Sequence, residues 1–363
     1  MRVLISTDTV GGVWDYTLTL VRALRGRGHE VLLAVIGTVD GERRRALPVG
    51  VEVEARQYRL EWMPGAAAEI EPAGEWLAGL ARRWRPDLVH LNQMAYAARD
   101  LGAPTLLVVH SDVLSWFGEV LGERPGPEWG EYARWVGEGI RSAAALVTPS
   151  AYQSALCLRH YGRAADRVIH NGARPPAREP PPRGAPLLVT LGRAWDEAKG
   201  MAVVDAAVGL LGGAAPPAHL LGEEHGPAGQ YFEARHLTRH GRAARAEVDA
   251  WLERASLYVG ASLYEPFGLA PLEAALRGCA LVLSDIGSFR ELWDGCAEFV
   301  PKGDARALAR AIARLAADPG RLAALAARAR MRALSRFTAE RVADEYLALY
   351  DGTSAGCQVP STT

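Results

Sequence analysis

The sequence predicts an α/β protein made of two doubly wound domains. Short apolar runs alternate with amphipathic stretches along most of the chain, which is the pattern of βαβ units. The alternation stops at residues 174–186, a segment with six prolines, and then starts again. Because proline lacks an amide donor and restricts φ, this segment is expected to be a stiff linker. A chain of 363 residues also has the length of two domains.

The first domain is predicted to comprise residues 1–174. Its apolar runs are rich in β-branched residues and have few polar interruptions, which is typical of parallel strands covered on both faces. The predicted strands are 3–6, 30–36, 87–91, 105–109, 144–148 and 168–170. The predicted helices are 14–25, 75–84 and 132–142.

The second domain is predicted over 187–338, after a linker at 175–186, and the tail 352–363 is predicted to be disordered. Its strands are predicted at 187–191, 219–221, 234–237, 257–260 and 280–284. The remaining helices are predicted at 201–211, 246–254, 269–277, 305–317, 321–335 and 339–350. Ligands bind outside the carboxyl ends of the strands in such sheets. We therefore expect an active site in a cleft that both sets of strand ends face.

Composition excludes several classes of protein. The formal net charge of -1 argues against a dedicated nucleic-acid binder. The four cysteines form no CxxC pair and no cluster with histidine, so neither a disulfide framework nor a zinc site is expected. No apolar run approaches the ~20 residues that span a bilayer, and the apolar start is too short for a signal peptide. A cytoplasmic protein is expected.

The strongest motif is residues 265–269, Glu-Pro-Phe-Gly-Leu, with Glu273 eight positions after Glu265. It follows a predicted strand and opens a predicted helix. A helix N-terminus offers unpaired amides and partial positive charge, which suit a phosphate, and Gly268 lets the backbone approach a ligand closely. Each glutamate alone is typical of a solvated surface. Together they suit two sets of hydroxyl groups, one on a sugar and one on a ribose, with phosphate between.

Three further loops follow predicted strands. Arg193 and Lys199 flank one of them and could clamp a diphosphate, the alternative being two solvated cations. Gly11-Gly12 forms a strand-to-helix turn that lacks both GxGxxG and GxxxxGK[ST], so it favours a tight turn or close approach to a ligand over a dinucleotide site. His110 is interpreted as a polar contact to a transferred sugar or as a packing histidine.

These residues resemble glycosyltransferase family 4, a retaining family of the GT-B fold, and the similarity covers essentially the whole chain. Glu265 and Glu273, with 266–269 between them, are similar to the family's hallmark. Gly192-Arg193 and Lys199-Gly200 resemble the family's diphosphate-binding element. His110 resembles the histidine that the family places beside the donor sugar, and Asn171-Gly172 resembles its domain-closing signature.

The resemblance implies two Rossmann-like domains facing across a cleft, with the donor bound by the second and the acceptor by the first. It also implies that a last helix, 339–351, returns to the first domain. Arg193 and Lys199 would hold the diphosphate, Glu265 the sugar hydroxyls and Glu273 the ribose. The catalytic candidates are Arg193, Lys199, Glu265 and His110. The donor-binding candidates are Gly12, Gly192, Phe267, Gly268, Leu269 and Glu273, and those on the acceptor side are Trp14, Asp15 and Trp116.

A nucleoside diphosphate sugar is the expected donor, with UDP or GDP favoured over ADP, and neither a cofactor nor a metal is expected. The acceptor is expected to be a hydroxyl group of a saccharide, a lipid-linked sugar or a small natural product. Peripheral contact with a membrane stays open, and no nucleic acid is expected as a partner. Five aromatic residues are equally consistent with an acceptor cleft and with buried core: Trp14, Trp62, Tyr96, Trp116 and Phe117.

No pair of carboxylates stands out for a double displacement. The sequence therefore favours a front-face reaction in which cations and helix amides stabilise the leaving group. Two alternatives use the same fold: a sugar-nucleotide epimerase or glycan phosphorylase, and a non-catalytic subunit that binds nucleotide sugars. The arginines between 306 and 336 are typical of a solvated helix face rather than of a nucleic-acid-binding module.

Overall fold

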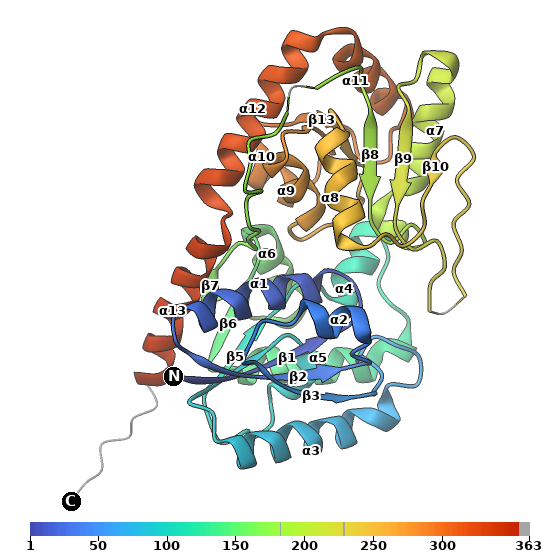
Figure 1. The fold of residues 1–363 in the computed structure, drawn as a ribbon. Coiled ribbons are helices and arrows are strands. Elements are labelled where there is room, and N and C mark those ends of the chain that lie inside the picture. Colours follow the sequence, from blue (N-terminus) through green and yellow to red (C-terminus); the bar gives the residue numbers. More distant parts are fainter. Residues whose placement is uncertain (182, 228, 356–363) are drawn as a thin grey trace, which may run out of the picture. The chain divides into compact units, whose positions relative to one another are not determined.

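The computed structural model describes residues 1–181, 183–227 and 229–355, and these divide into two compact units (Figure 1). Unit 1 consists of Met1–Gly118, Gly122–Gly172 and the C-terminal segment from Ala339. Unit 2 consists of Ala173–Thr338 and the short segment Glu119–Leu121. Every strand pairing in the described residues is parallel, as expected for βαβ units.

In the described residues, unit 1 has a seven-stranded sheet in the order β3-β2-β1-β4-β5-β6-β7. Its strands are β1 (Arg2–Asp8), β2 (Glu30–Ile36), β3 (Glu52–Arg56), β4 (Leu88–Leu91), β5 (Thr105–Val108), β6 (Ala145–Thr148) and β7 (Arg167–Val168). Its helices are α1 (Gly12–Gly26), α2 (Gly41–Ala46), α3 (Ala67–Trp84), α4 (Val113–Trp116), α5 (Gly130–Ser142), α6 (Ala151–Tyr161) and α13 (Ala339–Ala355). Shorter turns are η1 (Met94–Tyr96) and η3 (Pro127–Trp129), while the π-helical η2 (Phe117–Leu121) has its first two residues in unit 1 and the rest in unit 2.

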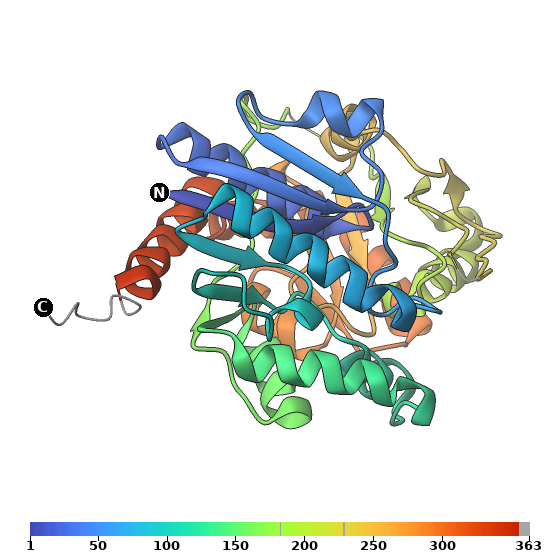
Figure 2. The same ribbon diagram turned by 90° about the horizontal axis from the view of Figure 1, so that it is seen from below.

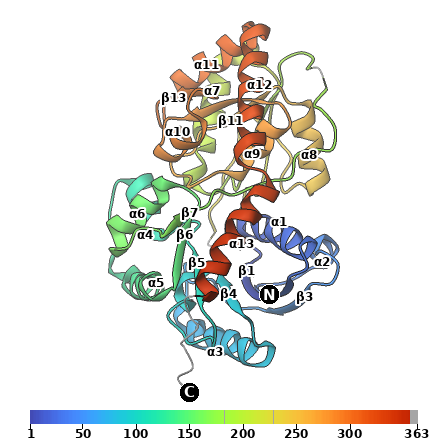
Figure 3. The same cartoon turned by 90° about the vertical axis from the view of Figure 1, so that its left-hand side faces the viewer.

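Alternate residues of β4 serve the two faces of this sheet. Val89 and Leu91 are fully buried in a core that includes α3 and α5, and Figure 2 shows these two helices crossing that face. His90 points to the other face, where its ring contacts Tyr16 of α1 and Tyr350 of α13. The helices α1 and α13 pack against each other there (Figure 3). The last helix is therefore part of unit 1.

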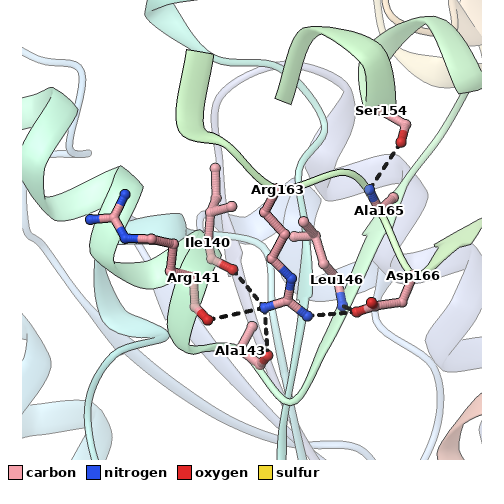
Figure 4. A network of polar contacts seen from close by, with 8 residues as sticks. All are labelled: Ile140, Arg141, Ala143, Leu146, Ser154, Arg163, Ala165 and Asp166. Carbon is pink, nitrogen blue, oxygen red and sulfur yellow. Dashed lines mark hydrogen bonds and ion pairs between the residues drawn. The ribbon is translucent and has the colours of Figure 1, made fainter. Parts of the chain in front are cut away.

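Arg163 joins the C-terminal end of α5 to the segment that leads into β7 (Figure 4). Its Nη1 donates to the carbonyls of Ile140 and Ala143, both at 2.8 Å. Its Nη2 donates to Asp166 at 2.6 Å, and the same carboxylate accepts from the amide of Leu146 at 2.7 Å. The last carbonyls of a helix have no partners within the helix. The guanidinium therefore caps the C-terminal end of α5. Its positive charge also interacts favourably with the negative end of the helix dipole.

In the described residues, unit 2 has a six-stranded sheet in the order β10-β9-β8-β11-β12-β13. Its strands are β8 (Leu188–Leu191), β9 (Ala218–Leu221), β10 (Thr238–Arg239), β11 (Leu257–Gly260), β12 (Ala280–Ser284) and β13 (Glu298–Val300). Its helices are α7 (Met201–Leu211), α8 (Arg245–Arg254), α9 (Leu269–Leu276), α10 (Gly287–Trp293), α11 (Ala305–Ala317) and α12 (Pro319–Arg336), with 3₁₀ turns η4 (Glu197–Lys199) and η5 (Gly212–Ala214).

Helices cover both faces of the second sheet. One core joins alternate strand residues such as Val189 and Leu281 to α8, α9 and α10. The other joins Leu188 and Val282 to α7 and α11. Residues of α12 belong to both cores. With both faces covered, the strands read as continuous apolar runs, which is why the sequence reveals them.

The predicted elements differ from the structure mainly at sheet edges. The strand predicted at 234–237 is wrong, because β10 is Thr238–Arg239, and both of its residues are exposed. The edge strands β3 and β13 and the helices α2, α6 and α10 were not predicted. At the C-terminus, α13 continues to Ala355, beyond the predicted end at 351, and the hydroxyl of Thr353 donates to the carbonyl of Leu349 at 2.8 Å. The rest of the predicted tail, 356–363, lies outside the described residues.

Within residues 1–181, 183–227 and 229–355, no helix combines the length and the apolarity that a bilayer crossing requires. Cys157, Cys279 and Cys296 are buried free thiols. Cys357 lies outside the described part of the chain.

The packing of α13 generates a stability prediction. Ala343 is fully buried in α13, so Ala343→Asp places an unpaired carboxylate in the core. It should lower the free energy of unfolding by ~3 kcal/mol or more, measured by urea titration. The neighbouring Asp344 is exposed and pairs with Arg27 at 2.5 Å, so Asp344→Ala should change stability by at most ~1 kcal/mol. Equal effects of the two changes would contradict this account of α13.

Candidate active site

The loop after β8 carries Arg193 and Lys199, with the nearly buried Asp196 between them. Oδ2 of Asp196 accepts from Arg193 at 2.8 Å. Oδ1 accepts from the amide of Ala198 at 3.1 Å, which caps the 3₁₀ turn ending at Lys199. One carboxylate therefore orients the guanidinium and shapes the turn that carries the ammonium. The sequence did not single out Asp196, although it lies inside the motif.

Lys199 contacts the first glutamate of the pair, because its Nζ donates to Oε2 of Glu265 at 2.6 Å. Each side chain is about one-fifth exposed, at 20% and 18%. The backbones of the two loops also meet, since the amide of Leu263 donates to the carbonyl of Ala198 at 2.8 Å. The loops follow the neighbouring strands β8 and β11. The fold thus brings together two candidates that are 66 positions apart.

A tight turn leads from Glu265 into α9. The hydroxyl of Ser288 donates to the carbonyl of Glu265, and Gly268 has a φ of 87°, a conformation that favours glycine. Phe267 is 3% exposed, and its ring packs edge-on against Phe337 with centroids 5.5 Å apart. The side chain of Phe267 therefore anchors the turn, which leaves only its backbone as a candidate for donor binding. The helix that follows begins at Leu269.

Glu273, on the first turns of α9, forms an ion pair with Arg245 at the start of α8. Arg245 also pairs with Asp249 at 2.8 Å, and Asp249 pairs with Arg277 at 2.6 Å. Burial by itself lowers the pKa of Arg245, but the two carboxylates outweigh it and raise the pKa overall. Arg245 is a partner that sequence reasoning missed, because the segment 230–245 shows no pattern that points to it.

The two cations keep capacity for an anion beyond their carboxylates. An ammonium has three donors and a guanidinium has five, so one carboxylate does not exhaust either Lys199 or Arg193. The identity of the cation at 199 is also informative. Only two of the 41 basic residues in the chain are lysines, at 199 and 302. A compact ammonium on a flexible stem binds as a point charge, unlike a planar guanidinium. The contrast between Lys199 and the many arginines of the chain is therefore a further signal in the sequence.

In unit 1, His110 follows β5 and is held as a neutral imidazole. Nδ2 of Asn92 donates to the carbonyl of Ser6 at 2.7 Å, so its Oδ1 is the acceptor for Nε2 of His110 at 2.8 Å. The proton of His110 is therefore on Nε2. Tyr16 packs against the ring with centroids 4.5 Å apart. Burial lowers the pKa of His110 to about 3.

His90, on the neighbouring strand β4, connects Tyr16 of α1 to the last helix. Its Nδ1 is 2.6 Å from the hydroxyl of Tyr350, and its Nε2 is 3.3 Å from the hydroxyl of Tyr16. Burial, and then the neighbouring His110, lower the pKa of His90 to about 3. Tyr346 of α13 completes the group with its ring 5.3 Å from His90. This cluster was not predicted, because its members come from four distant parts of the chain.

A buried carboxyl lies near the turn that follows β1. Glu61 accepts from the amides of Met94 and Ala95, both at 3.0 Å. Burial raises its pKa to about 7, although the two amide bonds oppose the shift. Asp8, at the end of β1, adds to the rise and accepts from Gln93 at 3.1 Å. Neither acid was a sequence candidate.

The remaining candidates occupy these positions. Gly12 begins α1 and is exposed, and Gly11 before it has a φ of 74°. Trp14 is buried at 7% exposure, whereas Asp15 is exposed. Trp116 is half-buried, with its ring edge-on to Phe117 at 5.4 Å. Of the other two tryptophan and tyrosine candidates for the predicted cleft, Tyr96 is buried and Trp62 is partly buried against the core.

Metal ligands do not gather in the part of the chain that is described. No group of three or more histidine, cysteine, aspartate or glutamate side chains there is arranged to hold a metal ion.

Comparison with known proteins identifies the family. The model of "Glycosyltransferase Family 4" matches residues 10–175, and that of "Glycosyl transferases group 1" matches residues 185–318. This chain belongs to the family 4 glycosyltransferases. The resemblance stated from the motifs is therefore confirmed, and the protein is an enzyme of this class.

The names of similar proteins refer to several kinds of molecule. The phosphatidyl-myo-inositol mannosyltransferase of Mycolicibacterium smegmatis is 28% identical over 98% of this chain and 94% of its own. The glycogen synthase of Mycobacterium tuberculosis is 29% identical over 78% of this chain and 72% of its own. The lipopolysaccharide core biosynthesis mannosyltransferase LpcC of Rhizobium leguminosarum is 37% identical, over only 29% of this chain and 30% of its own length.

Solved structures confirm the GT-B fold. The sucrose-phosphate synthase of Thermosynechococcus elongatus superposes with a TM-score of 0.78 at 21% identity, covering 98% of this chain and 100% of that one. HepE of Anabaena, solved in complex with UDP-glucose, gives a TM-score of 0.75 at 18% identity, covering 97% and 100%. At these identities the likeness establishes the fold of the glycosyltransferase alone.

The buried acid and histidines generate a prediction about pH. Between about pH 4.5 and 6.5, unfolding lets His90 and His110 take up protons, whereas Glu61, protonated when folded, releases one. Stability contributed by the histidines is complete above pH 6.5 and is lost as the pH falls, and Glu61 opposes that loss. Glu61→Gln should therefore make the free energy of unfolding rise more steeply with pH between 5 and 6.5, by up to ~1.4 kcal/mol per pH unit.

The measurement is urea unfolding at a series of pH values. Glu54 is exposed on β3, so Glu54→Gln serves as the control and should give a curve parallel to that of the unmodified protein. A parallel curve for Glu61→Gln as well would show that Glu61 titrates as an ordinary surface carboxyl.

Proposed function

We propose that this glycosyltransferase moves a sugar from a nucleoside diphosphate sugar to an acceptor hydroxyl with retention of configuration. The observation that carries the proposal is the Lys199–Glu265 contact of 2.6 Å. It joins a cation suited to a phosphate with a carboxylate suited to sugar hydroxyls at the carboxyl ends of two neighbouring strands. The start of α9, one short turn away, adds amides that favour an anion.

Each charged group has a role in this proposal. Arg193 and Lys199 bind the diphosphate and stabilise the charge that develops on it as it leaves. Glu265 accepts from hydroxyls of the transferred sugar, while Lys199 and the carbonyl contact with Ser288 keep its position. Glu273 accepts from the ribose. His110 acts as a neutral hydrogen-bonding partner of the sugar, because its lowered pKa removes the positive charge.

The proposed reaction is a direct transfer that needs no nucleophile from the protein. The acceptor oxygen forms a bond to the anomeric carbon on the face from which the phosphate departs, and the bond between that carbon and the phosphate oxygen breaks. The proton of the acceptor hydroxyl passes to the leaving phosphate oxygen. The products are the glycoside and the nucleoside diphosphate, and the anomeric configuration is unchanged.

The proposal includes metal independence, because Arg193, Lys199 and the amides at the start of α9 supply positive charge to the phosphates. The acceptor is proposed to be a hydroxyl of a saccharide or of a lipid-linked sugar. Relatives named for phosphatidyl-myo-inositol and for glycogen support both classes.

The first test removes the ammonium. Lys199→Ala should lower turnover of the nucleotide sugar by about two to three orders of magnitude, because a donor that stabilises a developing anion contributes ~3–4 kcal/mol. The readout is release of nucleoside diphosphate, with circular dichroism to verify folding. Lys302→Ala, which changes the other lysine of the chain, is the matched control and should keep full turnover. Turnover of Lys199→Ala near that of the control would remove Lys199 from the mechanism.

The second test addresses metal independence. Turnover should be unchanged, within about twofold, after dialysis against EDTA and on subsequent addition of Mg²⁺ or Mn²⁺, because protein cations neutralise the diphosphate. A rate lost in EDTA and restored by either metal would overturn this part of the proposal and leave the sugar-transfer assignment in place.

A further inference from the structure

A depression of about 250 Å³ lies at the carboxyl ends of β9 and β10 in unit 2. It is lined by Glu223, Glu224, His225, Gly241 and Arg242. None of these residues has a role in the proposed reaction. The depression is strongly polar, and its walls present both an acid and a base.

The backbone connects this depression to the diphosphate loop. The amide of Ala194, next to Arg193, donates to the carbonyl of Glu223 at 2.7 Å. The amide of Gly222 donates to the carbonyl of Gly241 at 2.7 Å. The loops after β8, β9 and β10 are therefore joined in the order of the strands.

The depression also adjoins the proposed ribose site. The loop after β10 runs from Arg242 into α8, whose first residue, Arg245, pairs with Glu273. A ribose held by Glu273 would thus lie between the diphosphate loop and the loop of Arg242. A nucleoside diphosphate has the same order of groups, since its base is joined to the far side of the ribose from the phosphates. The depression is the place left for the base.

Two side chains in the depression are exposed enough to contact a ligand. Glu223 is 47% exposed and Arg242 is 55% exposed, and their closest charged atoms are 3.8 Å apart. Glu224 differs, because it is 15% exposed and pairs with Arg239 at 3.2 Å. Glu223 and Arg242 therefore present a carboxylate beside a guanidinium, whereas Glu224 supports the loop.

A carboxylate beside a guanidinium is complementary to guanine. Guanine has two parallel donors, N1–H and the 2-amino group, which match the two oxygens of a carboxylate. On its adjacent edge it has two acceptors, O6 and N7, which match a guanidinium fork. Uracil offers a carboxylate a single N–H flanked by two carbonyl oxygens. Adenine has no pair of parallel donors, and its amino group would face the guanidinium.

We infer that the depression recognises guanine through Glu223 and Arg242, so that the donor is a guanosine diphosphate sugar. The inference rests on the proposed function, because it needs the diphosphate at Arg193 and Lys199 and the ribose at Glu273. It adds the identity of the base, which the motifs of the sequence leave open.

Calorimetry with nucleoside diphosphates tests the inference without knowledge of the sugar or the acceptor. The protein should bind GDP about tenfold more tightly than UDP or ADP, because one well-formed bidentate pair distinguishes bases by about 5- to 150-fold. Glu223→Gln should weaken GDP about tenfold and leave UDP and ADP within about twofold. Glu233→Gln, which alters an exposed carboxylate of the same segment outside the depression, is the control and should leave all three affinities unchanged.

Inosine diphosphate provides a sharper comparison, because it lacks only the 2-amino group of guanine. The unmodified protein should bind GDP more tightly than IDP, and Glu223→Gln should bind them equally. If Glu223 had only a structural role, Glu223→Gln would weaken the binding of both GDP and IDP and preserve the ratio of the two affinities. A preserved ratio, or equal binding of GDP, UDP and ADP by the unmodified protein, would overturn the inference.

The proposed function fails by a different signature. Lys199→Ala and Glu273→Ala should each weaken the binding of GDP, UDP and ADP by similar factors, since both residues contact groups that these nucleotides share. If neither change weakens any of them, or if no nucleoside diphosphate binds, the donor assignment itself is wrong. If both changes weaken all three while the base preference is absent, only the guanine inference is wrong.

Discussion

Two backbone contacts that leave no space for a side chain hold together the loops of unit 2. A Cβ at Gly200 would overlap the carbonyl oxygen of Ala261, and one at Gly222 would overlap the carbonyl oxygen of Gly192. These contacts bring the loops after β8, β9 and β11 within reach of one another. The close approach of Lys199 to Glu265, and of Ala194 to Glu223, depends on them. Any larger residue at either glycine would separate the loops that carry the charged groups.

The charges of the site are arranged as pairs that leave hydrogen-bonding capacity unused. Arg193 pairs with Asp196, Lys199 with Glu265, and Glu273 with Arg245. An unpaired charge in a partly buried loop has a high desolvation free energy. Pairing each charge with an opposite one lowers this free energy and also fixes the positions of both side chains. Each cation can still donate hydrogen bonds to an anion, because it has more donors than one carboxylate uses. Such a site is organised before its substrate arrives, which is the condition for electrostatic stabilisation of a leaving group.

In unit 1, buried aromatic and imidazole rings determine the charge of the histidine candidate. Tyr16 packs against the ring of His110, and Tyr16 in turn contacts His90 and Tyr346, while His90 contacts Tyr350. Burial disfavours an imidazolium at His110, so this side chain can donate or accept a hydrogen bond but carries no charge at neutral pH. Two of these rings come from α13, the last helix of the chain. The C-terminal segment thus packs against Tyr16 and His90, which lie more than two hundred residues earlier in the chain.

How much the sequence predicts depends on burial. Strands covered on both faces appear as apolar runs, and 30–36, 257–260 and 280–284 match β2, β11 and β12 residue for residue. The edge strands β3, β7, β10 and β13 were missed or misplaced, because an edge strand is partly solvated and lacks such a run. The motifs at 193–199 and 265–273 could be proposed as binding loops from the sequence. A strand end followed by charged and glycine residues is a local signal, as a buried strand is.

The sequence by itself determined the α/β class, the buried strands, the proline-rich break and the charged residues of the motifs, because each is expressed in a short window of neighbouring residues. Only the tertiary structure decided the partners: Glu265 for Lys199, Arg245 for Glu273, Asn92 for His110, and Tyr350 for His90. These contacts join residues between 18 and 260 positions apart. They depend on strand order and helix packing, which no local pattern records.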